Sequence, residues 1–287
     1  MTIGFIGLGI MGSAMARNLL SGEAPLIVHN RTRSKADSLI TEGARWVSSP
    51  RDVAVSEIVF TMLAHPEAVQ SVALGADGFL DHMQPGTLWV DCSTVQPSFS
   101  REMAEAAVQR NVRFIDAPVT GSKPQAEDAQ LSFFAGGNSD DLEFCRPYLD
   151  MMGRNVVHVG KHGMGTSMKV VINALLATAV ASFSESVALG QALGLSEEML
   201  FNVVIGSPIS APGLAMKRDM MTTGDYDTQF PLQWMVKDLE MVTEAANDTN
   251  VNMPLSAATK DLYHSALQAG LGELDFAAIY SFLNRDY

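Results

Sequence analysis

The sequence has little of several things that define particular classes of protein. Its two cysteines, Cys92 and Cys145, are too few for a disulfide framework and lack a spacing typical of zinc ligands. Cations are also scarce, because 19 Lys and Arg residues stand against 32 Asp and Glu residues, a formal net charge of -13. Nucleic acids and anionic membranes are bound through basic surfaces, so we expect neither as a partner. We predict no metal site and a reducing, cytoplasmic setting.

Long uninterrupted apolar runs and low-complexity segments are missing too. The N-terminus has no basic segment before its first apolar stretch, so we expect no signal peptide. The most apolar long window, residues 168–195, contains Lys169, Asn173 and Glu185, so we predict no membrane-spanning segment. The apolar share of 47% is that of a folded protein, and 287 residues suffice for one large domain or two smaller ones. We favour two.

Short β-rich runs alternate with helical patterns up to about residue 160. We predict strands within 2–7, 25–30, 57–63, 86–92, 112–119, 130–137 and 155–160, and helices within 12–22, 34–43, 65–74, 98–111 and 140–153. Such alternation indicates βαβ units and a mostly parallel, doubly wound sheet of the Rossmann type. We therefore assign residues 1–160 to a dinucleotide-binding domain.

From residue 161 to residue 287 the pattern is helical only. Helices are predicted within 166–193, 196–207, 231–248 and 254–270. The first of these would be about 40 Å long, which is more than a small domain needs. The fold class is therefore α/β followed by an all-α domain, joined by a long interdomain helix. We expect the helical domain to serve substrate binding and oligomerisation.

The motif GLGIMG, residues 7–12, lies between the first predicted strand and the first predicted helix. It matches the G-x-G-x-x-G pattern of dinucleotide-binding proteins. There the first glycine permits a tight turn, the second lets the pyrophosphate approach the main chain, and the third lets helix and strand pack closely. We predict cofactor contacts at Gly7, Gly9, Ile10, Met11 and Gly12, against the alternative of a purely structural turn.

The second strand ends in Asn30, Arg31 and Thr32, where an NAD-binding domain would have an acidic residue. A missing carboxylate and an adjacent guanidinium suit a 2′-phosphate, because the carboxylate would repel it and the guanidinium binds it. We therefore predict NADP(H) as the cofactor. The alternative is a solvated basic face, which is our interpretation of Lys35.

Loops after strands are where ligands bind in such a sheet. These loops contain Leu63, Thr94 and the hydroxyl and amide groups of Thr120, Gly121 and Ser122. Lys169 and Asn173 lie four residues apart, and hence on one face of the predicted long helix. Burial lowers the pKa of a lysine, so such a lysine can exchange a proton near neutrality. A lysine stem that only covers apolar surface is the alternative.

The motifs GFIGLGIMGSAMARNLL, DCST, DAPVTGS, GMGTSMKVVIN and KDL follow one another in an order that resembles the β-hydroxyacid dehydrogenases, the 3-hydroxyisobutyrate dehydrogenase-like family. The resemblance covers the whole chain. It implies a Rossmann domain, a long connecting helix, an all-helical second domain, and homodimers or homotetramers. It also implies that Lys169 is the general acid/base and that Asn173 orients it or the substrate.

The same resemblance implies binding roles for other residues. Thr120 and Gly121, where the family has Ser-Gly, would bind the substrate carboxylate, Thr94 would lie between substrate and nicotinamide, and Lys237 would lie near the cofactor. The segment after them resembles the glyoxylate/succinic semialdehyde reductase branch, although Gln125 replaces a proline and Ala129 a glycine. Two further residues match that branch's substrate site, namely Phe230 and Asp238.

We therefore predict an oxidoreductase that uses NADPH to reduce a short aldehyde-acid, a small-molecule carboxylate such as glyoxylate or succinic semialdehyde. One alternative is NAD(P)-dependent oxidation of 3-hydroxyisobutyrate or another hydroxy acid, the same chemistry in the opposite direction. A non-catalytic dinucleotide-binding sensor is the alternative of another class. A sensor has no need of Lys169 and Asn173 on one helix face.

Overall fold

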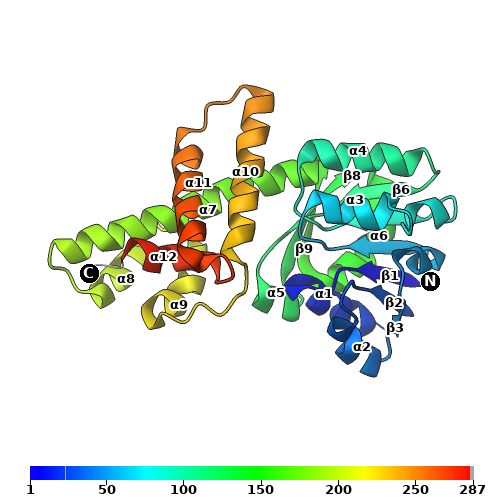
Figure 1. Cartoon of the computed structure of the whole chain (residues 1–287), viewed down its shortest axis with the longest axis horizontal. Coiled ribbons are helices and arrows are strands. Elements are labelled where there is room, and N and C mark those ends of the chain that lie inside the picture. The colour runs from blue at the N-terminus through cyan, green and yellow to red at the C-terminus, as the bar shows by residue number, and fades with distance from the viewer. Residues whose placement is uncertain (23, 285–287) are drawn as a thin grey trace. The chain divides into compact units, whose positions relative to one another are not determined.

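The structure is a computed structural model that describes residues 1–22 and 24–284 of the chain (Figure 1). The chain divides into two compact units, Met1–Lys169 and Val170–Tyr287. The first unit alternates strands and helices, and the second is built from helices. This is the predicted order of an α/β half followed by an all-α half, and the fold class is confirmed.

The first unit is built on a nine-stranded sheet among the described residues, in the order β3-β2-β1-β4-β5-β6-β8-β7, with β9 paired to β8. The strands are β1 (Ile3–Ile6), β2 (Leu26–His29), β3 (Arg45–Trp46), β4 (Ile58–Thr61), β5 (Leu88–Asp91), β6 (Arg113–Asp116), β7 (Val119–Thr120), β8 (Leu131–Gly137) and β9 (Gly153–Gly160). Strands β1 to β6 are parallel. The strand order reverses between β1 and β4, so their carboxyl ends border the crevice where doubly wound sheets bind ligands.

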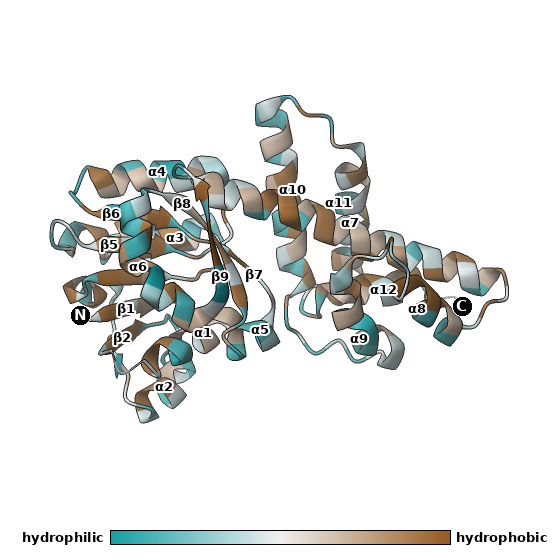
Figure 2. Ribbon diagram, turned by 180° about the vertical axis from the view of Figure 1, so that it is seen from behind, coloured by the Kyte–Doolittle hydropathy of each residue, from teal (hydrophilic) through white to brown (hydrophobic). Residues whose placement is uncertain are grey.

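Helices cover both faces of this sheet because successive strand residues point to opposite sides. Phe60 belongs to one apolar cluster and its neighbour Val59 to the other. The first cluster packs under α1 (Ile10–Leu20), α2 (Asp37–Thr41), α5 (Lys123–Glu127) and α6 (Ser139–Met152), and the second under α3 (Pro66–Leu74) and α4 (Pro97–Val108). Figure 2 shows the strands as the brown, apolar layer between these helices. The carboxyl ends of β1 and β4 are thus held by apolar packing on both faces of the sheet.

All seven predicted strands and all five predicted helices of this unit are present. The prediction missed the two-residue strands β3 and β7 and the short helix α5, which lie in segments with no extended periodic pattern. It also gave no direction for β8, which runs antiparallel to β6 and β7. Strand direction depends on how the chain returns to the sheet, which periodicity does not encode.

The second unit continues the long helix α7 (Met164–Ala192), whose first turns belong to the first unit. It is followed by α8 (Glu197–Ile205), α9 (Arg218–Thr223), α10 (Leu232–Thr249), α11 (Pro254–Ala266) and α12 (Ile279–Leu283), with short 3₁₀ turns at Pro212–Lys217 and Phe276–Ala278. Their apolar faces meet in one core around Phe201, Leu232, Met235 and Tyr263. The predicted helices are confirmed, whereas α9, α12 and the 3₁₀ turns were missed.

By length and composition alone, α7 is apolar and long enough to cross a membrane. Half of its most apolar window is buried within the protein, and core helices of soluble proteins meet the same criterion. Length and composition therefore do not separate the two possibilities, and the absence of a membrane segment stays a prediction. Exposed apolar residues on this helix include Val171 and Leu175, at 65% and 72% exposure.

Candidate active site

The three glycines of the first loop are each required for a different reason. Gly7 has φ +102°, and a Cβ there would overlap the main-chain oxygen of Met62 at the end of β4. A Cβ on Gly12 would overlap the main-chain oxygen of Gly7, so helix α1 could not pack this closely on β1. These two positions are fixed by packing within the protein.

Gly9 differs from its neighbours because a Cβ there would meet no atom of the described residues within 4 Å. Its φ of -77° is also open to any residue. Gly9 is the residue that precedes α1, and no side chain of the described part of the chain caps this helix start. The open space and the uncapped helix N-terminus fit a pyrophosphate, which approaches main-chain N–H groups at this place. The loop therefore fits a dinucleotide.

Asn30 links the glycine loop to the end of β2. Its Oδ1 accepts a hydrogen bond from Leu8 N at 2.9 Å, and its Nδ2 donates to Thr32 O at 2.9 Å. The carboxamide thus holds together the two loops on which the predicted cofactor contacts lie. Arg31 and Thr32 are exposed beyond it. The positions suit a 2′-phosphate, while the predicted contact of Asn30 itself with the cofactor stays a prediction.

A chain of buried hydrogen bonds fixes the loops after β4 and β5. Trp89 Nε1 donates to Thr61 Oγ1 at 2.9 Å, and Thr61 Oγ1 donates to Asp91 Oδ1 at 2.7 Å. Asp91 Oδ1 also accepts from Ser93 N at 3.1 Å, and Ser93 Oγ accepts from Leu63 N at 2.9 Å. Burial raises the pKa of Asp91, and these hydrogen bonds oppose the rise.

This network positions two of the predicted contacts. Leu63 is held by its main chain, and Thr94, which is half-buried, follows directly after Ser93. The sequence predicted no role for Thr61 or Asp91. Both are polar residues at the ends of otherwise apolar strands, and this position is the signal that could have identified them.

Thr120, Gly121 and Ser122 form the turn between β7 and α5. Gly121 has φ +121°, which only glycine adopts easily, and Thr120 is half-buried. Both the main-chain N–H and the hydroxyl of Ser122 donate to Gln125 Oε1 at 2.9 Å. Gln125 therefore closes the first turn of α5, as the Ser-x-x-Gln pattern of a capping box would have predicted.

Ala129, the other departure from the reductase branch, has φ +54°. This is the left-handed region, where glycine is favoured and alanine is strained. The structure thus explains why a glycine would be favoured at this position and shows that an alanine adopts the left-handed conformation here. The segment retains its turn, and the strain is local.

Helix α7 begins against the carboxyl group of Asp116, at the end of β6. Gly163 N donates to Asp116 Oδ1 at 2.7 Å, and Thr166 N donates to Oδ2 at 2.9 Å. A Cβ on Gly165 would overlap the main-chain oxygen of Phe134, so this glycine permits the close approach of helix and sheet. Burial raises the pKa of Asp116 to about 7 against the pull of these N–H groups.

Lys169 follows one turn after this anchored start and is 9% exposed. A buried lysine is uncommon and is retained where it is paired or functional. Asn173 lies one turn further along α7, so both residues share a face of one helix. Asp116 therefore fixes the first turns of the helix that carries both residues.

Within the second unit, Asn173 contacts helix α10. Its Nδ2 donates to Asp238 Oδ2 at 2.5 Å, and Lys237 Nζ lies 3.1 Å from Asp238 Oδ1. Asn173 Oδ1 is buried without a hydrogen-bond partner among the described residues. Because the amide nitrogen is committed to the carboxylate, the oxygen of Asn173 is left as the acceptor for a donor outside this pair.

The two cysteines are buried, and burial raises the pKa of Cys92 well above its usual range and that of Cys145 to about 12. Thiols held in the protonated form are poor nucleophiles, so neither suits catalysis. Within the described ranges, no group of three or more His, Cys, Asp or Glu residues is placed to hold a metal ion.

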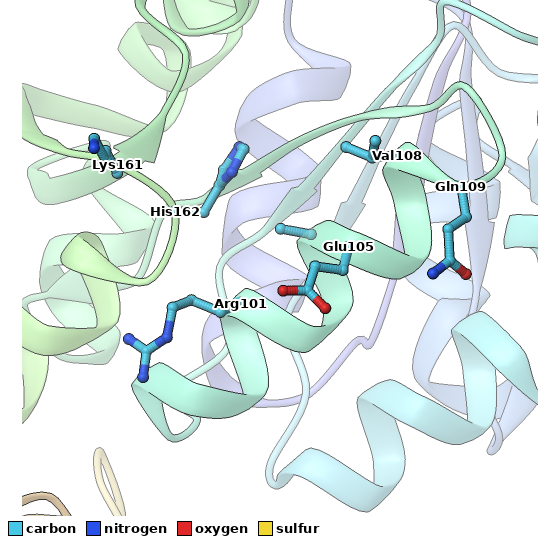
Figure 3. A pocket seen from close by; sticks show the side chains of 7 residues that line it. Arg101, Glu105, Val108, Gln109, Lys161 and His162 are labelled. Atoms are coloured by element: carbon cyan, nitrogen blue, oxygen red, sulfur yellow. The ribbon is translucent and has the colours of Figure 1, made fainter.

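A groove of about 580 Å³ lies elsewhere in the first unit, between α4 and the loop before α7 (Figure 3). Its lining includes Arg101, Glu105, Lys161 and His162, with charges of both signs at an open surface. None of the predicted site residues lines it. This groove is therefore not part of the candidate site.

Comparison with known proteins matches both halves of the chain to dehydrogenase families. Residues 2–160 match the NAD binding domain of 6-phosphogluconate dehydrogenase. Residues 163–283 match the NAD-binding domain of NADP-dependent 3-hydroxyisobutyrate dehydrogenase. Glyoxylate/succinic semialdehyde reductase 2 of Arabidopsis thaliana, a chloroplastic protein, is 38% identical over 97% of this chain and 78% of its own length. The chain belongs to the 3-hydroxyisobutyrate dehydrogenase-like family.

Other members of the family differ in the substrates and cofactors they are named for. NAD-dependent L-serine dehydrogenase of Pseudomonas aeruginosa is 36% identical over 96% of both chains. The structure of Mycobacterium tuberculosis 3-hydroxyisobutyrate dehydrogenase with L-serine superimposes with a TM-score of 0.89 at 30% identity, over 98% of both chains. As a 3-hydroxyisobutyrate dehydrogenase-like protein, this chain is an oxidoreductase that binds a nicotinamide dinucleotide.

Proposed function

We propose that the protein is an NADPH-dependent reductase of short aldehyde-acids such as glyoxylate or succinic semialdehyde. The observation that carries the proposal is the buried Lys169, held on α7 by the anchored helix start and followed one turn later by Asn173. A sensor of dinucleotides gains nothing from this arrangement. The identity of 38% to a glyoxylate/succinic semialdehyde reductase supports the substrate class.

In the proposed reaction, the bound nicotinamide supplies a hydride to the carbonyl carbon of the aldehyde. Lys169 donates a proton to the carbonyl oxygen, and the oxygen of Asn173 orients the donor. The hydroxyl of Thr120 and the main-chain N–H of Gly121 are proposed to bind the substrate carboxylate, while Ser122, whose N–H and hydroxyl both donate to Gln125, holds the turn in place. The protein thereby contributes orientation and a positioned proton donor.

Arg31 and Thr32 are proposed to bind the 2′-phosphate of NADPH. They are exposed beyond β2, and Asn30, which holds this turn to the glycine loop, introduces no negative charge. Replacing Arg31 with Ala should weaken NADPH binding by about tenfold, the loss expected for one charge-assisted contact, and leave NADH binding unchanged. Isothermal titration of both nucleotides measures this preference.

Initial rates decide the reaction class. We would measure NADPH and NADH consumption with glyoxylate and with succinic semialdehyde, and NAD⁺ and NADP⁺ reduction with L-serine and 3-hydroxyisobutyrate. The measurements with L-serine and 3-hydroxyisobutyrate test the alternative of hydroxy-acid oxidation. The 36% identity to an NAD-dependent L-serine dehydrogenase favours this alternative. Turnover of hydroxy acids alone, with NAD⁺ preferred, would replace the proposal. Binding without any turnover would favour the sensor.

We also propose that the protein is a homodimer or homotetramer. Exposed apolar side chains lie on α7, on α8 and between them, and include Leu175, Leu189, Leu193, Met199 and Val203, each at least 53% exposed. Apolar exposure of this extent is typical of surfaces that associate. Light scattering after size exclusion should give twice or four times the chain mass, and a monomer would refute the proposal.

A further inference from the structure

A buried ion pair in the second unit lies apart from every residue named so far in the reaction. Lys217 Nζ is 2.9 Å from Asp275 Oδ2, and their side chains are 5% and 0% exposed. The ammonium also lies 5.1 Å from the ring centre of Phe276. Burying two charges costs hydration, and apolar residues of the same size often stabilise a core as well or better. A contribution to stability alone therefore does not explain why the pair is present.

Asp275 makes contacts that an apolar residue could not replace. Its Oδ2 accepts hydrogen bonds from Gln229 N at 3.2 Å and Phe230 N at 3.0 Å, and its Oδ1 accepts from Ala277 N at 3.1 Å. Both carboxylate oxygens are thus used for main-chain N–H groups. Lys217 neutralises the carboxylate and donates to Gln229 Oε1 at 3.1 Å. The pair is therefore centred on the segment 229–230.

Phe230 is held at both its main-chain groups by this arrangement. Besides the bond from its N–H to Asp275, its carbonyl oxygen accepts from Phe276 N at 2.9 Å. The rings of Phe230 and Phe276 lie 5.4 Å apart between centroids, tilted at 57°. Helix α10, which carries Lys237 and Asp238, begins two residues later at Leu232, whose N–H donates to Leu274 O at 2.8 Å. The anchor thus fixes both Phe230 and the start of α10.

We propose that the Lys217–Asp275 pair is a positioning device that sets the place of Phe230 and thereby the affinity for the aldehyde substrate. This inference rests on the proposed function together with the substrate contact that the sequence predicts for Phe230. Neither Lys217 nor Asp275 touches substrate or cofactor in this proposal. They act through the main chain of residues 229–230, so their loss changes substrate affinity and not the proton transfer by Lys169.

Three variants separate positioning from stability. Asp275→Asn keeps the side-chain shape but leaves one acceptor where two are needed, and Lys217→Met leaves a buried carboxylate without its cation. Each should raise the KM for the aldehyde about tenfold, the equivalent of one charge-assisted hydrogen bond, with kcat and the Kd for NADPH nearly unchanged. The double variant should regain thermal stability, because no unpaired charge remains, while its KM stays raised.

Phe201→Leu is the matched control, because Phe201 is fully buried in the same core and contacts neither member of the pair in the bonds described above. It should lower the melting temperature without changing KM. Hydrogen exchange of the 229–230 amides should accelerate in Asp275→Asn and not in Phe201→Leu. A KM that is unchanged in Asp275→Asn, or equally raised in Phe201→Leu, would overturn the inference. Unchanged amide exchange in Asp275→Asn would do the same.

Phe230→Ala distinguishes failure of this inference from failure of the proposed function. If Phe230→Ala raises KM, then adding Asp275→Asn should raise it no further, since the pair acts through Phe230. Additive effects would overturn the inference and leave the proposed function standing. If Phe230→Ala leaves KM unchanged, the proposed substrate contact is wrong, and amide exchange still reports whether the pair anchors the segment.

Discussion

The two units hold their candidate site residues by different means. In the first unit, the glycine loop and the turn of residues 120–122 are shaped by main-chain geometry, as at Gly7 and Gly121, whose φ angles are +102° and +121°. The loops after β4 and β5 are held in addition by buried side-chain hydrogen bonds. In the second unit, the candidate residues are side chains fixed by buried polar contacts across long stretches of sequence. Asn173 and Asp238 are 65 residues apart, and Lys217 and Asp275 are 58 apart.

This difference has a chemical consequence. A main-chain cradle binds phosphate groups shared by all nicotinamide dinucleotides, so it changes little with substrate. Side chains held by ion pairs can be exchanged singly or in pairs, so they suit the part of the site that distinguishes one carboxylic substrate from another. On the proposed function, the first unit supplies the dinucleotide cradle, the carboxylate-binding turn and Lys169, and the second unit supplies Phe230 and the ion pair that positions it.

The largest expected effect comes from Lys169, the last residue of the first unit. Lys169→Ala should lower kcat by about a thousandfold, within the range of general acid catalysis, because the proton donor is lost. The Kd for NADPH should stay within about threefold of the original, since the cradle is main chain. Stopped-flow turnover and fluorescence titration measure the two quantities. Near-normal turnover would remove Lys169 from the mechanism.

A second prediction compares two glycines of the same motif. Gly12→Ala should destabilise the first unit by about 3 kcal/mol or more, because its Cβ overlaps the main chain of Gly7. Gly9→Ala should cost only about 1 kcal/mol of stability but weaken NADPH binding at least about tenfold. Urea unfolding and nucleotide titration of both variants test this contrast. Equal effects of the two on nucleotide binding would mean that Gly9 does not face the pyrophosphate.

A third prediction concerns pH and Asp116. Its pKa is about 7 in the folded protein, above the ordinary value of 3.8, so the folded state binds this proton more tightly than the unfolded state. The contribution of Asp116 to stability is therefore present below about pH 4 and is lost as the pH rises toward 7.

Between pH 5 and pH 8, the free energy of unfolding of the wild type should fall by about 2 to 3 kcal/mol relative to that of Asp116→Asn. Because the comparison is a difference between two proteins, the titrating groups that do not interact with Asp116 cancel. Denaturant unfolding at both pH values measures it. A difference that is constant with pH, or one of opposite sign, would show that Asp116 keeps its charge throughout this range.

The smallest expected effect is at Ala129, which has φ +54°. Ala129→Gly should stabilise the protein by about 0.5 to 1 kcal/mol, the left-handed strain of alanine less the extra chain entropy of glycine. Thermal unfolding should show a slightly raised melting temperature. Ala126→Gly, in the adjoining helix α5, is the matched control and should be destabilising.

Much of the first unit was predictable because its signals are local. The alternation of apolar strands and amphipathic helices gave the order of elements, and the spacing of Gly7, Gly9 and Gly12 gave the loop. The helix α5 was missed, although the Ser122 and Gln125 pattern that caps it was visible in the sequence. Its brevity, its Pro124 and the preceding Gly121 and Ser122 favoured a turn.

The remainder was not predictable because it depends on contacts between distant residues. Asp116 is 47 residues from Gly163, and nothing near it in the sequence indicates that it holds the start of a helix. Asp275 likewise follows an ordinary Gly-Glu-Leu turn, and its partner Lys217 lies in a separate segment. Only the tertiary fold brings these groups together and excludes water from them. The predicted roles of the site residues in binding and catalysis remain predictions.

The chain of buried hydrogen bonds that fixes the loops after β4 and β5 limits which substitutions this protein can accept over evolutionary time. The side chain of Trp89 donates to Thr61, that of Thr61 donates to Asp91, Asp91 accepts from Ser93 N, and the Ser93 hydroxyl accepts from Leu63 N. Exchange of one member alone strands its neighbour's donor or acceptor in a dry interior, at a cost of about 1 to 3 kcal/mol. Related proteins should therefore retain these four residues together. Substitutions should accumulate at the exposed positions around them well before they occur at these four.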